Sequence, residues 1–481
     1  MSIRKVSILK SIDWLTILFY IIMVIAGWFT ICGASYEYDS MSLFDVAGRP
    51  GSQLLWIGLS VGLVFIIMML DKDIFDVFAY FIYFIIVLLL IATIFLAPDI
   101  KGSGSWLVLG PVRLQPAEFA KFATALAVAR FMSQYGFKLN TPKNFVSTLL
   151  LIFIPMICIL LQKETGSALV YLAFFLVLYR EGMSGKVLLI GCCAVLFFVT
   201  NMKFLDVIVG ITPLGELIVT LMILVITTIL TVGASRNKGI LYWIVSIIAF
   251  AFLAGYIVSL LVPVNFYWIA LALTLSLCCY LLYLAFRTWI MKYALIAIFA
   301  LGSIAFLFSI EYVFDNILEP HHQVRIKVSL GLEDDPTGAG YNVNQSKIAI
   351  GSGGLTGKGF LNGTQTKLKY VPEQETDFIF CTIGEEHGFV GSTLVVLLFS
   401  AFIIRLIQLA ERQETAFARI YGYSVASIFL FHLVINIGMV IGLTPVIGIP
   451  LPFFSYGGSS LLGFTILLFI FLRLDSSRRG N

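Results

Sequence analysis

Residues 14–34 read WLTILFYIIMVIAGWFTICGA, an apolar run without a single charged side chain. A run of about 20 apolar residues is long enough to cross the hydrocarbon core of a bilayer as a helix. Arg4, Lys5 and Lys10 precede the run, and more apolar runs follow it. We therefore interpret it as a retained first span with a cytoplasmic N-terminus, and not as a cleaved signal peptide.

The rest of the chain repeats this pattern. Its 481 residues are 60% hydrophobic and 12% charged, which leaves too little polar surface for a soluble globule. The seven cysteines lie almost wholly in apolar runs and form no CxxC pair, so they predict neither disulfides nor a metal site. The sequence predicts an all-α polytopic membrane protein with about 14 transmembrane helices, at about 14–34, 53–70, 75–97, 116–132, 145–162, 165–180, 187–202, 214–233, 240–262, 266–286, 289–313, 390–410, 418–441 and 459–472.

The basic residues indicate how these spans are oriented. The segments expected inside hold 19 Lys and Arg residues, whereas the short loops expected outside hold five. Cytoplasmic loops carry the excess of Lys and Arg, so both termini are predicted to be cytoplasmic. The same orientation places the long polar run 314–389 on the outer side of the membrane.

That polar run is the part of the chain best suited to chemistry in water. It holds 16 charged residues and 11 of the 40 glycines, with Glu333, Asp334 and Asp335 near its middle. A connector this long is usually functional or disordered, and apolar residues interrupt this one often enough for it to pack. Its Lys and Arg residues would suit a diphosphate, and the glycines of 351–359 would either admit such a ligand or serve tight turns alone.

Two features within the apolar regions also stand out. Glu118 and Lys121 follow Gln115-Pro116 on one face of a predicted helix, where they form either a structural ion pair between helices or the polar wall of a substrate cavity. Residues 444–458 are apolar but rich in Pro and Gly, which predicts a re-entrant segment lining a polar cavity. Glu164 places another carboxylate at an external helix end, where a solvated loop charge is the simpler interpretation.

Several motifs, taken together and in order, resemble the RodA/FtsW/SpoVE family of shape, elongation, division and sporulation (SEDS) proteins. Gly363-Thr364-Gln365 ahead of Pro372-Glu373 is more similar to the RodA members than to the FtsW members. The motifs are Gln115-Pro116-Ala117-Glu118 with Lys121, Asp335-Pro336-Thr337-Gly338-Ala339-Gly340-Tyr341, Gln345-Ser346, Ala349 to Gly354, Thr376-Asp377-Phe378-Ile379-Phe380, Glu385-Glu386 and Pro452 to Ser460.

The resemblance implies a ten-helix body with about four inserted helices. It divides the chain into membrane helices at 1–185, inserted helices at 186–288, a helix leading to the loop at 289–313, a large extracytoplasmic catalytic loop at 314–389, and C-terminal helices at 390–481. An even number of inserted helices keeps the loop outside. From their lack of ionisable residues well inside the spans, we expect the inserted helices to lie at the periphery and to take no part in the chemistry.

The activity implied is a peptidoglycan glycosyltransferase that polymerises lipid II for cell elongation and shape. Asp335 matches the acidic residue on which family activity depends. A class B penicillin-binding transpeptidase and other elongation proteins are the expected partners. The expected substrate or cavity residues are Glu118, Lys121, Gln323, Arg325, Gln345, Ser346, Thr376, Asp377, Glu385, Glu386 and Ser455.

Glycosyl transfer needs a base for the acceptor hydroxyl and positive charge for the departing diphosphate. Asp335 is the candidate base, and Arg325, Lys121 or a divalent cation such as magnesium or manganese is the candidate for the charge. Glu333 and Asp334 are the carboxylates that would hold a cation. A lipid-linked precursor flippase or transporter, and a non-catalytic scaffold of the cell-wall machinery, are the alternative functions.

Overall fold

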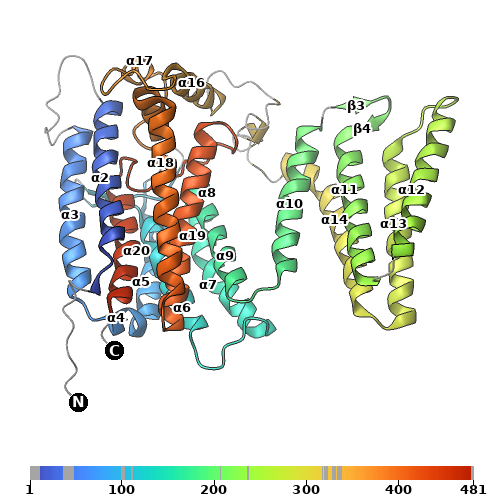
Figure 1. The fold of residues 1–481 in the computed structure, drawn as a ribbon, viewed down its shortest axis with the longest axis horizontal. Helices are drawn as coiled ribbons and strands as arrows, with labels where there is room; N and C mark the ends of the chain where they lie inside the picture. Colours follow the sequence, from blue (N-terminus) through green and yellow to red (C-terminus); the bar gives the residue numbers. More distant parts are fainter. Residues whose placement is uncertain are drawn as a thin grey trace. The chain divides into compact units, whose positions relative to one another are not determined.

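The computed structural model describes residues 11–35, 48–98, 103–109, 112–205, 207–235, 238–316, 318, 323–324, 326–327, 332 and 339–477 (Figure 1). The chain forms two compact units. The first comprises Met1–Ser184 and Tyr341–Asn481, and the second comprises Gly185–Gly340.

The first unit is a helical bundle with one short hairpin. Strand β1 (Leu107–Leu109) pairs antiparallel with β2 (Val112–Leu114) just before α6. Its helices are α2 (Trp14–Ser35), α3 (Arg49–Met69), α4 (Lys72–Val77), α5 (Ala79–Leu96), α6 (Pro116–Met132), α7 (Pro142–Leu161), α8 (Thr165–Leu169), the 3₁₀ helix η1 (Val170–Ala173), α9 (Phe174–Arg180), α16 (Ala339–Ser352), α17 (Thr364–Lys367), α18 (Ile379–Glu411), α19 (Ala416–Val440) and α20 (Gly458–Ser476).

Helices α6, α19 and α20 form the centre of this bundle and pack against one another. In α19 and α20, 72% and 78% of the most apolar window is buried, against 17% in α3 and α5. Aromatic rings fill the space between the central helices, with Phe429 and Phe464 at 5.6 Å and Phe429 and Phe453 at 5.4 Å between centroids. The outer helices therefore present their apolar residues to the outside, as membrane-facing helices do.

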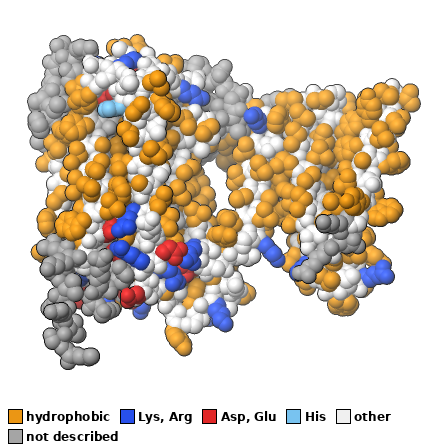
Figure 2. Space-filling model, in the orientation of Figure 1, with side chains coloured by type: hydrophobic (Ala, Val, Ile, Leu, Met, Phe, Trp, Pro, Cys, Tyr) orange, Lys and Arg blue, Asp and Glu red, His pale blue; other side chains and the backbone are white. Residues whose placement is uncertain are grey.

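Charged residues join the start and end of the chain at one end of this bundle. Asp13 pairs with Arg405 of α18 and accepts a hydrogen bond of 2.6 Å from the Thr16 hydroxyl. Arg412 pairs with Asp475 at the end of α20. Figure 2 shows Lys, Arg, Asp and Glu side chains gathered at this end, while orange hydrophobic side chains cover the flank of the bundle.

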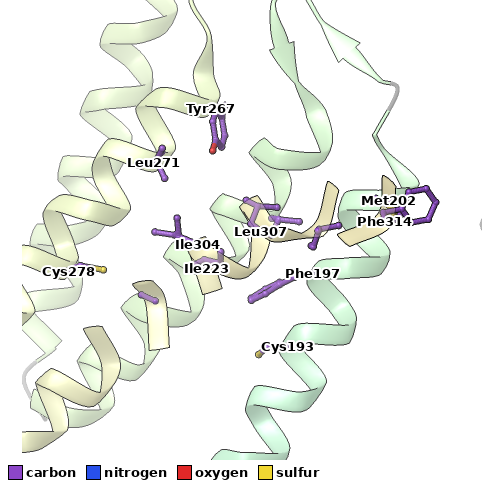
Figure 3. Close-up of a cluster of buried hydrophobic side chains, with 13 residues drawn as sticks. Cys193, Phe197, Met202, Ile223, Tyr267, Leu271, Cys278, Ile304, Leu307 and Phe314 are labelled. Atoms are coloured by element: carbon purple, nitrogen blue, oxygen red, sulfur yellow. The ribbon is translucent and has the colours of Figure 1, made fainter. Parts of the chain in front are cut away.

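The second unit contains five long helices and a second short hairpin. They are α10 (Gly185–Lys203), α11 (Leu214–Ser235), α12 (Lys238–Ser259), α13 (Phe266–Thr288) and α14 (Met291–Asn316), with β3 (Ile208–Val209) antiparallel to β4 (Thr212–Pro213). Buried side chains from four of these helices meet in one cluster, which includes Phe197, Ile223, Leu271, Ile304 and Phe314 (Figure 3). Helix α14, which leads to the long polar run, therefore packs with the inserted helices.

The all-α membrane architecture expected from the sequence is confirmed. Within the described ranges, twelve helices are long and apolar enough to cross a membrane. The other two predicted spans correspond to α6, with 17 residues, and to the shorter apolar stretch Thr165–Arg180. The predicted start of a span at 390 differs from the observed helix, because α18 begins at Ile379 and continues across a non-helical residue, Gly388 (φ 64°, ψ −159°).

Candidate functional site

Two residues near the start of α6 form a buried ion pair. Pro116 occupies the start of the helix, where its missing N–H costs nothing, so Glu118 and Lys121 fall three residues apart on one face. The Lys121 Nζ lies 2.7 Å from the Glu118 Oε2, and these residues are only 2% and 3% exposed. The pair predicted from the sequence is thus formed within one helix, and both charges are shielded from water.

His432 of α19 completes this pair, and sequence reasoning missed it. Its Nε2 lies 3.2 Å from the Lys121 Nζ, and its Nδ1 lies 3.0 Å from the carbonyl oxygen of Pro450. Because a carbonyl only accepts, Nδ1 carries the proton and Nε2 accepts from the lysine. The signal was available, since His432 is the only histidine within a predicted span and intramembrane ionisable residues are functional candidates by default.

The ring of Phe464 closes the other side of this group. The Lys121 Nζ stands 4.6 Å from the centroid of the ring, and the His432 ring meets it edge-on at 4.8 Å. An ammonium over an aromatic face is stabilised by the quadrupole of the ring. We call Glu118, Lys121, His432 and Phe464 the buried charge cluster.

Residues 444–458 have the irregular backbone that the Pro and Gly content predicts. Side chains of neighbouring elements satisfy its backbone groups: Asn436 Nδ2 donates to the Ile449 carbonyl at 2.7 Å and to the Asp377 carbonyl at 2.8 Å. Within the segment, the Ser455 hydroxyl accepts a hydrogen bond from the Leu451 N–H at 2.8 Å. The same hydroxyl donates to the Thr376 carbonyl at 2.6 Å. Thr376, Asp377 and Ser455 therefore join the long polar run to the irregular segment.

Two carboxylates, Asp377 and Glu164, lie beside this irregular segment or next to the elements that contact it. The Asp377 carboxylate lies so close to Gly448 (φ 76°) that a Cβ there would stand 3.2 Å from its Oδ2. A Cβ on Gly166 of α8 would stand 2.7 Å from the Ile447 carbonyl oxygen. Glu164, just ahead of α8, accepts hydrogen bonds from the Ser103 and Ser105 hydroxyls at 3.0 and 2.9 Å. Glu164 is thus held by protein hydroxyls as well as being a loop charge.

Glu385 organises part of the long polar run 314–389. Its fully buried carboxylate accepts hydrogen bonds of 2.7 Å from Lys358 Nζ and 2.8 Å from the backbone N–H groups of Gln365 and Thr366. The two N–H donors belong to α17, whose N-terminus favours a negative charge. With its lone pairs engaged by protein donors, Glu385 fixes the loop and has little capacity left for a substrate.

Glu386 lies in a different environment. The N–H of Leu361 donates to its Oε1 at 3.1 Å, while its Oε2 is buried without a hydrogen-bond partner in the described part of the chain. The carboxylate presses against Gly33 of α2, where any side chain would overlap it. The two adjacent carboxylates therefore differ in their hydrogen bonds: both oxygens of Glu385 accept from protein donors, whereas only one oxygen of Glu386 does so within the described part of the chain.

Two glycines of 351–359, Gly353 and Gly357, allow the backbone of this segment to approach the backbone of α18 closely. Because Gly388 is not helical, carbonyl and N–H groups of α18 near it need partners outside the helix. The glycine-rich segment supplies them: the Lys358 N–H donates to the Glu385 carbonyl at 3.0 Å, and the Gly359 N–H donates to the Glu386 carbonyl at 2.9 Å. In return, Phe389 N–H donates to Gly354 O at 2.9 Å. A Cβ on Gly357 would overlap the Glu386 carbonyl and one on Gly353 would overlap the Gly384 carbonyl, so close backbone packing accounts for these two glycines.

Of the remaining residues predicted to form the site, some lie in the part of the chain that the structure describes and others lie outside it. Ser346 of α16 donates to the Val440 carbonyl at 2.6 Å and so ties α16 to the end of α19, and Gln345 beside it is half-buried. Gln323 donates to the carbonyls of Phe314 and Leu318 within the second unit. Asp335 and Arg325 lie outside the described residues.

The predicted cation ligands Glu333 and Asp334 also lie outside the described residues. Among the side chains that the structure does describe, no three His, Cys, Asp or Glu residues gather in a group able to hold a metal ion.

The chain is similar to known proteins along almost its whole length. A family model for FtsW, RodA and SpoVE, described as cell cycle protein, matches residues 13–209 and 208–480. The peptidoglycan glycosyltransferase RodA of Treponema pallidum is 30% identical over 85% of either chain. The peptidoglycan glycosyltransferase MrdB of Escherichia coli strain K12 is 29% identical over 90% of this chain and 89% of its own.

Solved structures show the same fold. A chain of a peptidoglycan synthase complex, described as coordinating polymerization and crosslinking, superposes with a TM-score of 0.64 at 22% identity, covering 97% of this chain and 98% of that one. The rod shape determining protein RodA of Thermus thermophilus superposes with a TM-score of 0.56 at 21% identity, covering 97% of both chains.

Proposed function

The chain belongs to the FtsW/RodA/SpoVE family, and from this membership we infer that it is a membrane-embedded peptidoglycan glycosyltransferase of the RodA type. The observation that carries the inference is similarity over nearly the whole chain to relatives named for this activity. It is a multi-pass membrane enzyme, as its apolar helices require. A role in cell shape follows from the RodA and MrdB relatives.

The substrate proposed is lipid II, a disaccharide peptide on a polyprenyl diphosphate. An acceptor sugar hydroxyl attacks the anomeric carbon of the donor, and the bond from that carbon to the diphosphate breaks. The hydroxyl proton passes to a base, and the leaving diphosphate keeps the bonding electron pair. Asp335 is the proposed base, because it matches the acidic residue of the family's loop motif and a carboxylate can accept this proton.

The geometry favours a positioning role for Lys121. The residue is only 2% exposed and its ammonium group contacts Glu118 and His432, so little of its charge is directed at a departing diphosphate. Through His432 and the Pro450 carbonyl it instead holds the irregular segment, which Ser455 and Asn436 join to the external loop. Arg325 is thus the better proposed partner of the diphosphate.

The proposed orientation places the termini in the cytoplasm and the loop outside a bacterial cytoplasmic membrane. It is supported by the excess of Lys and Arg in the segments expected inside. The charged end of the first unit, where Asp13 meets Arg405, agrees with a cytoplasmic position for the N-terminus. A class B transpeptidase is the proposed partner, supported by the likeness in fold to a chain of a synthase complex.

The test of the base is the exchange Asp335→Asn in purified full-length protein supplied with lipid II. This substitution nearly conserves volume and removes the basicity, so glycan polymerisation should fall at least 100-fold. Thermal stability and membrane insertion should stay near wild type. Asp73→Asn is the matched control, because this exposed carboxylate lies in the first turn of α4, far along the chain from the loop.

Two outcomes would contradict the assignment. Polymerisation by Asp335→Asn at a rate comparable to wild type would remove Asp335 as the base. Transport of lipid II across vesicles by a wild-type protein that forms no polymer would favour the precursor translocase instead.

A further inference from the structure

The second unit carries a groove that the proposed chemistry does not use. It encloses about 430 Å³ between α11, α12 and α13, and its lining is almost entirely apolar. Leu224 and Leu277 form a buried floor, whereas Trp243 and Ile247 at the rim are 74% and 56% exposed. This volume falls within the range of small-molecule sites, roughly 300–1,000 Å³.

The groove exists because α12 packs loosely. Only 6% of its most apolar window is buried, against 39% for α11, although both have the composition of membrane spans. Within a bilayer no hydrophobic force draws two apolar helix faces together, since lipid tails are equally apolar. An apolar chain of the bilayer is therefore the natural occupant of this space.

The groove lies about two helical turns from a pair of basic residues, Arg287 and Lys292, measured along α13. Tyr280 lines it, and Arg287 follows seven residues later on the same face of α13, two turns or about 10 Å along the axis. Arg287 is exposed, as is Lys292 in the first turn of α14, which packs against α13. Figure 2 shows Lys and Arg side chains at this end of the second unit.

Aromatic residues mark the same level. Phe286 and Trp289 flank Arg287 and stack with centroids 6.3 Å apart. Exposed tryptophans concentrate where a bilayer meets water, at the level of the lipid headgroups. Arg287 and Lys292 thus lie at headgroup depth, and the groove lies at the depth of the acyl chains.

We propose that this groove binds one anionic phospholipid, with an acyl chain between α12 and α13 and the phosphate headgroup at Arg287 and Lys292. The negative charge of the headgroup complements these two exposed basic residues. They lie at the end of the second unit that the distribution of Lys and Arg along the sequence predicts to be cytoplasmic. The polyprenyl diphosphate substrate is disfavoured as the occupant, because under the proposed orientation it reacts at the opposite face. The proposal does not depend on the glycosyltransferase activity.

Native mass spectrometry of the purified full-length chain tests the charge recognition. Phosphatidylglycerol should bind about tenfold more tightly than phosphatidylcholine with the same acyl chains, because each nearby basic residue favours an anionic lipid. The double variant Arg287→Gln/Lys292→Gln should reduce this preference to less than twofold. Lys143→Gln is the matched control, an exposed lysine at the start of α7 in the first unit, and should keep the full preference.

A second pair of variants tests the groove itself. Ser276→Trp places a large side chain inside the lining and should abolish the tightly bound lipid, whereas Leu282→Trp places the same side chain outside the lining and should not. Circular dichroism and thermal unfolding verify that both variants fold. Equal binding of the two phospholipids to wild type, or phosphatidylglycerol binding that survives Ser276→Trp, would overturn the proposal. So would displacement of phosphatidylglycerol by an equimolar polyprenyl phosphate, or occupation of the groove by a co-purified protein helix.

Discussion

His432 determines what the buried charge cluster can do. A neutral imidazole whose Nδ1 donates to Pro450 presents a lone pair to Lys121, so the ammonium is held between a carboxylate and a histidine. Each of these groups would be costly to bury alone. The cluster is therefore stable only as a unit, and each member keeps the others in place.

This coupling predicts a non-additive mutant cycle. Glu118→Gln or Lys121→Met alone leaves a buried charge without its partner, which should cost about 3–5 kcal/mol of stability. The double variant removes both charges and should cost clearly less than the sum of the two. Thermal unfolding in detergent and polymerase assays on all four proteins measure the cycle, and strictly additive losses in both would contradict the coupling.

Asp13 makes a second prediction, which concerns acid stability. Burial alone would raise the pKa of its carboxyl group, but hydrogen bonds from Arg405 and Thr16 outweigh this and hold the pKa below its usual value. Because the folded pKa lies below the unfolded one, the stabilisation is fully present above about pH 4. It is lost as the pH falls further through the folded pKa.

The measurement is the thermal midpoint between pH 6 and pH 3 in detergent. Wild type should lose more stability over this range than Asp13→Asn, which has no proton to bind at this position. Asp73→Asn serves as the control, because its exposed carboxylate should leave the acid-induced loss as in wild type. Parallel curves for wild type and Asp13→Asn would refute the linkage.

Helix α18 and the glycine-rich segment 351–359 hold each other in place through backbone hydrogen bonds. Gly388 interrupts the helix, and the backbone of the segment supplies the missing hydrogen bonds on both sides of the interruption. The sequence shows a cluster of glycines, but which backbone groups they approach depends on residues about 30 positions later. Periodicity therefore predicted the apolar part of α18 and not its start at Ile379.

Gly357→Ala tests this junction. Gly357 has φ 81°, which costs an alanine about 1–2 kcal/mol, and the new Cβ would also overlap the Glu386 carbonyl. We expect faster protease cleavage within 352–370 and reduced polymerase activity. Gly351→Ala is the matched control, since nothing lies within 4 Å of its Cβ position in α16 and alanine favours helix by about 0.5–1 kcal/mol. Equal behaviour of the two variants would argue against the junction.

For the whole molecule, composition and apolar periodicity were enough to predict an all-α membrane protein, while the pairing of distant residues was not. Glu118 and Lys121 are neighbours on one helix, so their ion pair could be predicted. His432 reaches them from 311 residues away, and Glu385 collects donors spread over the loop, so both depend on the tertiary fold. The grouping of α14 with the inserted helices is likewise a matter of packing, because its sequence resembles any other span.

A deletion that joins Glu181 to Trp289 tests the role of the inserted helices at this level. It removes four predicted spans and so preserves the orientation of the loop. The face of α14 thereby uncovered carries Ala300, Ile304, Leu307 and Ile310, all apolar, and can face lipid at little cost. We expect insertion and polymerase activity to persist, and a correctly inserted variant without activity at saturating lipid II would show that these helices are needed for catalysis.

The Glu385 contacts also set an order of events during biosynthesis. Lys358 leaves the ribosome 27 residues before Glu385, the carboxylate that holds it. At roughly 5–20 residues per second this amounts to a delay of about 1–5 s. During that interval the glycine-rich segment has neither the Glu385 carboxylate nor the α18 backbone as a hydrogen-bond partner. Loop closure therefore waits for the arrival of α18 in the membrane, so an enzyme whose synthesis stops before that helix cannot assemble this part of the loop.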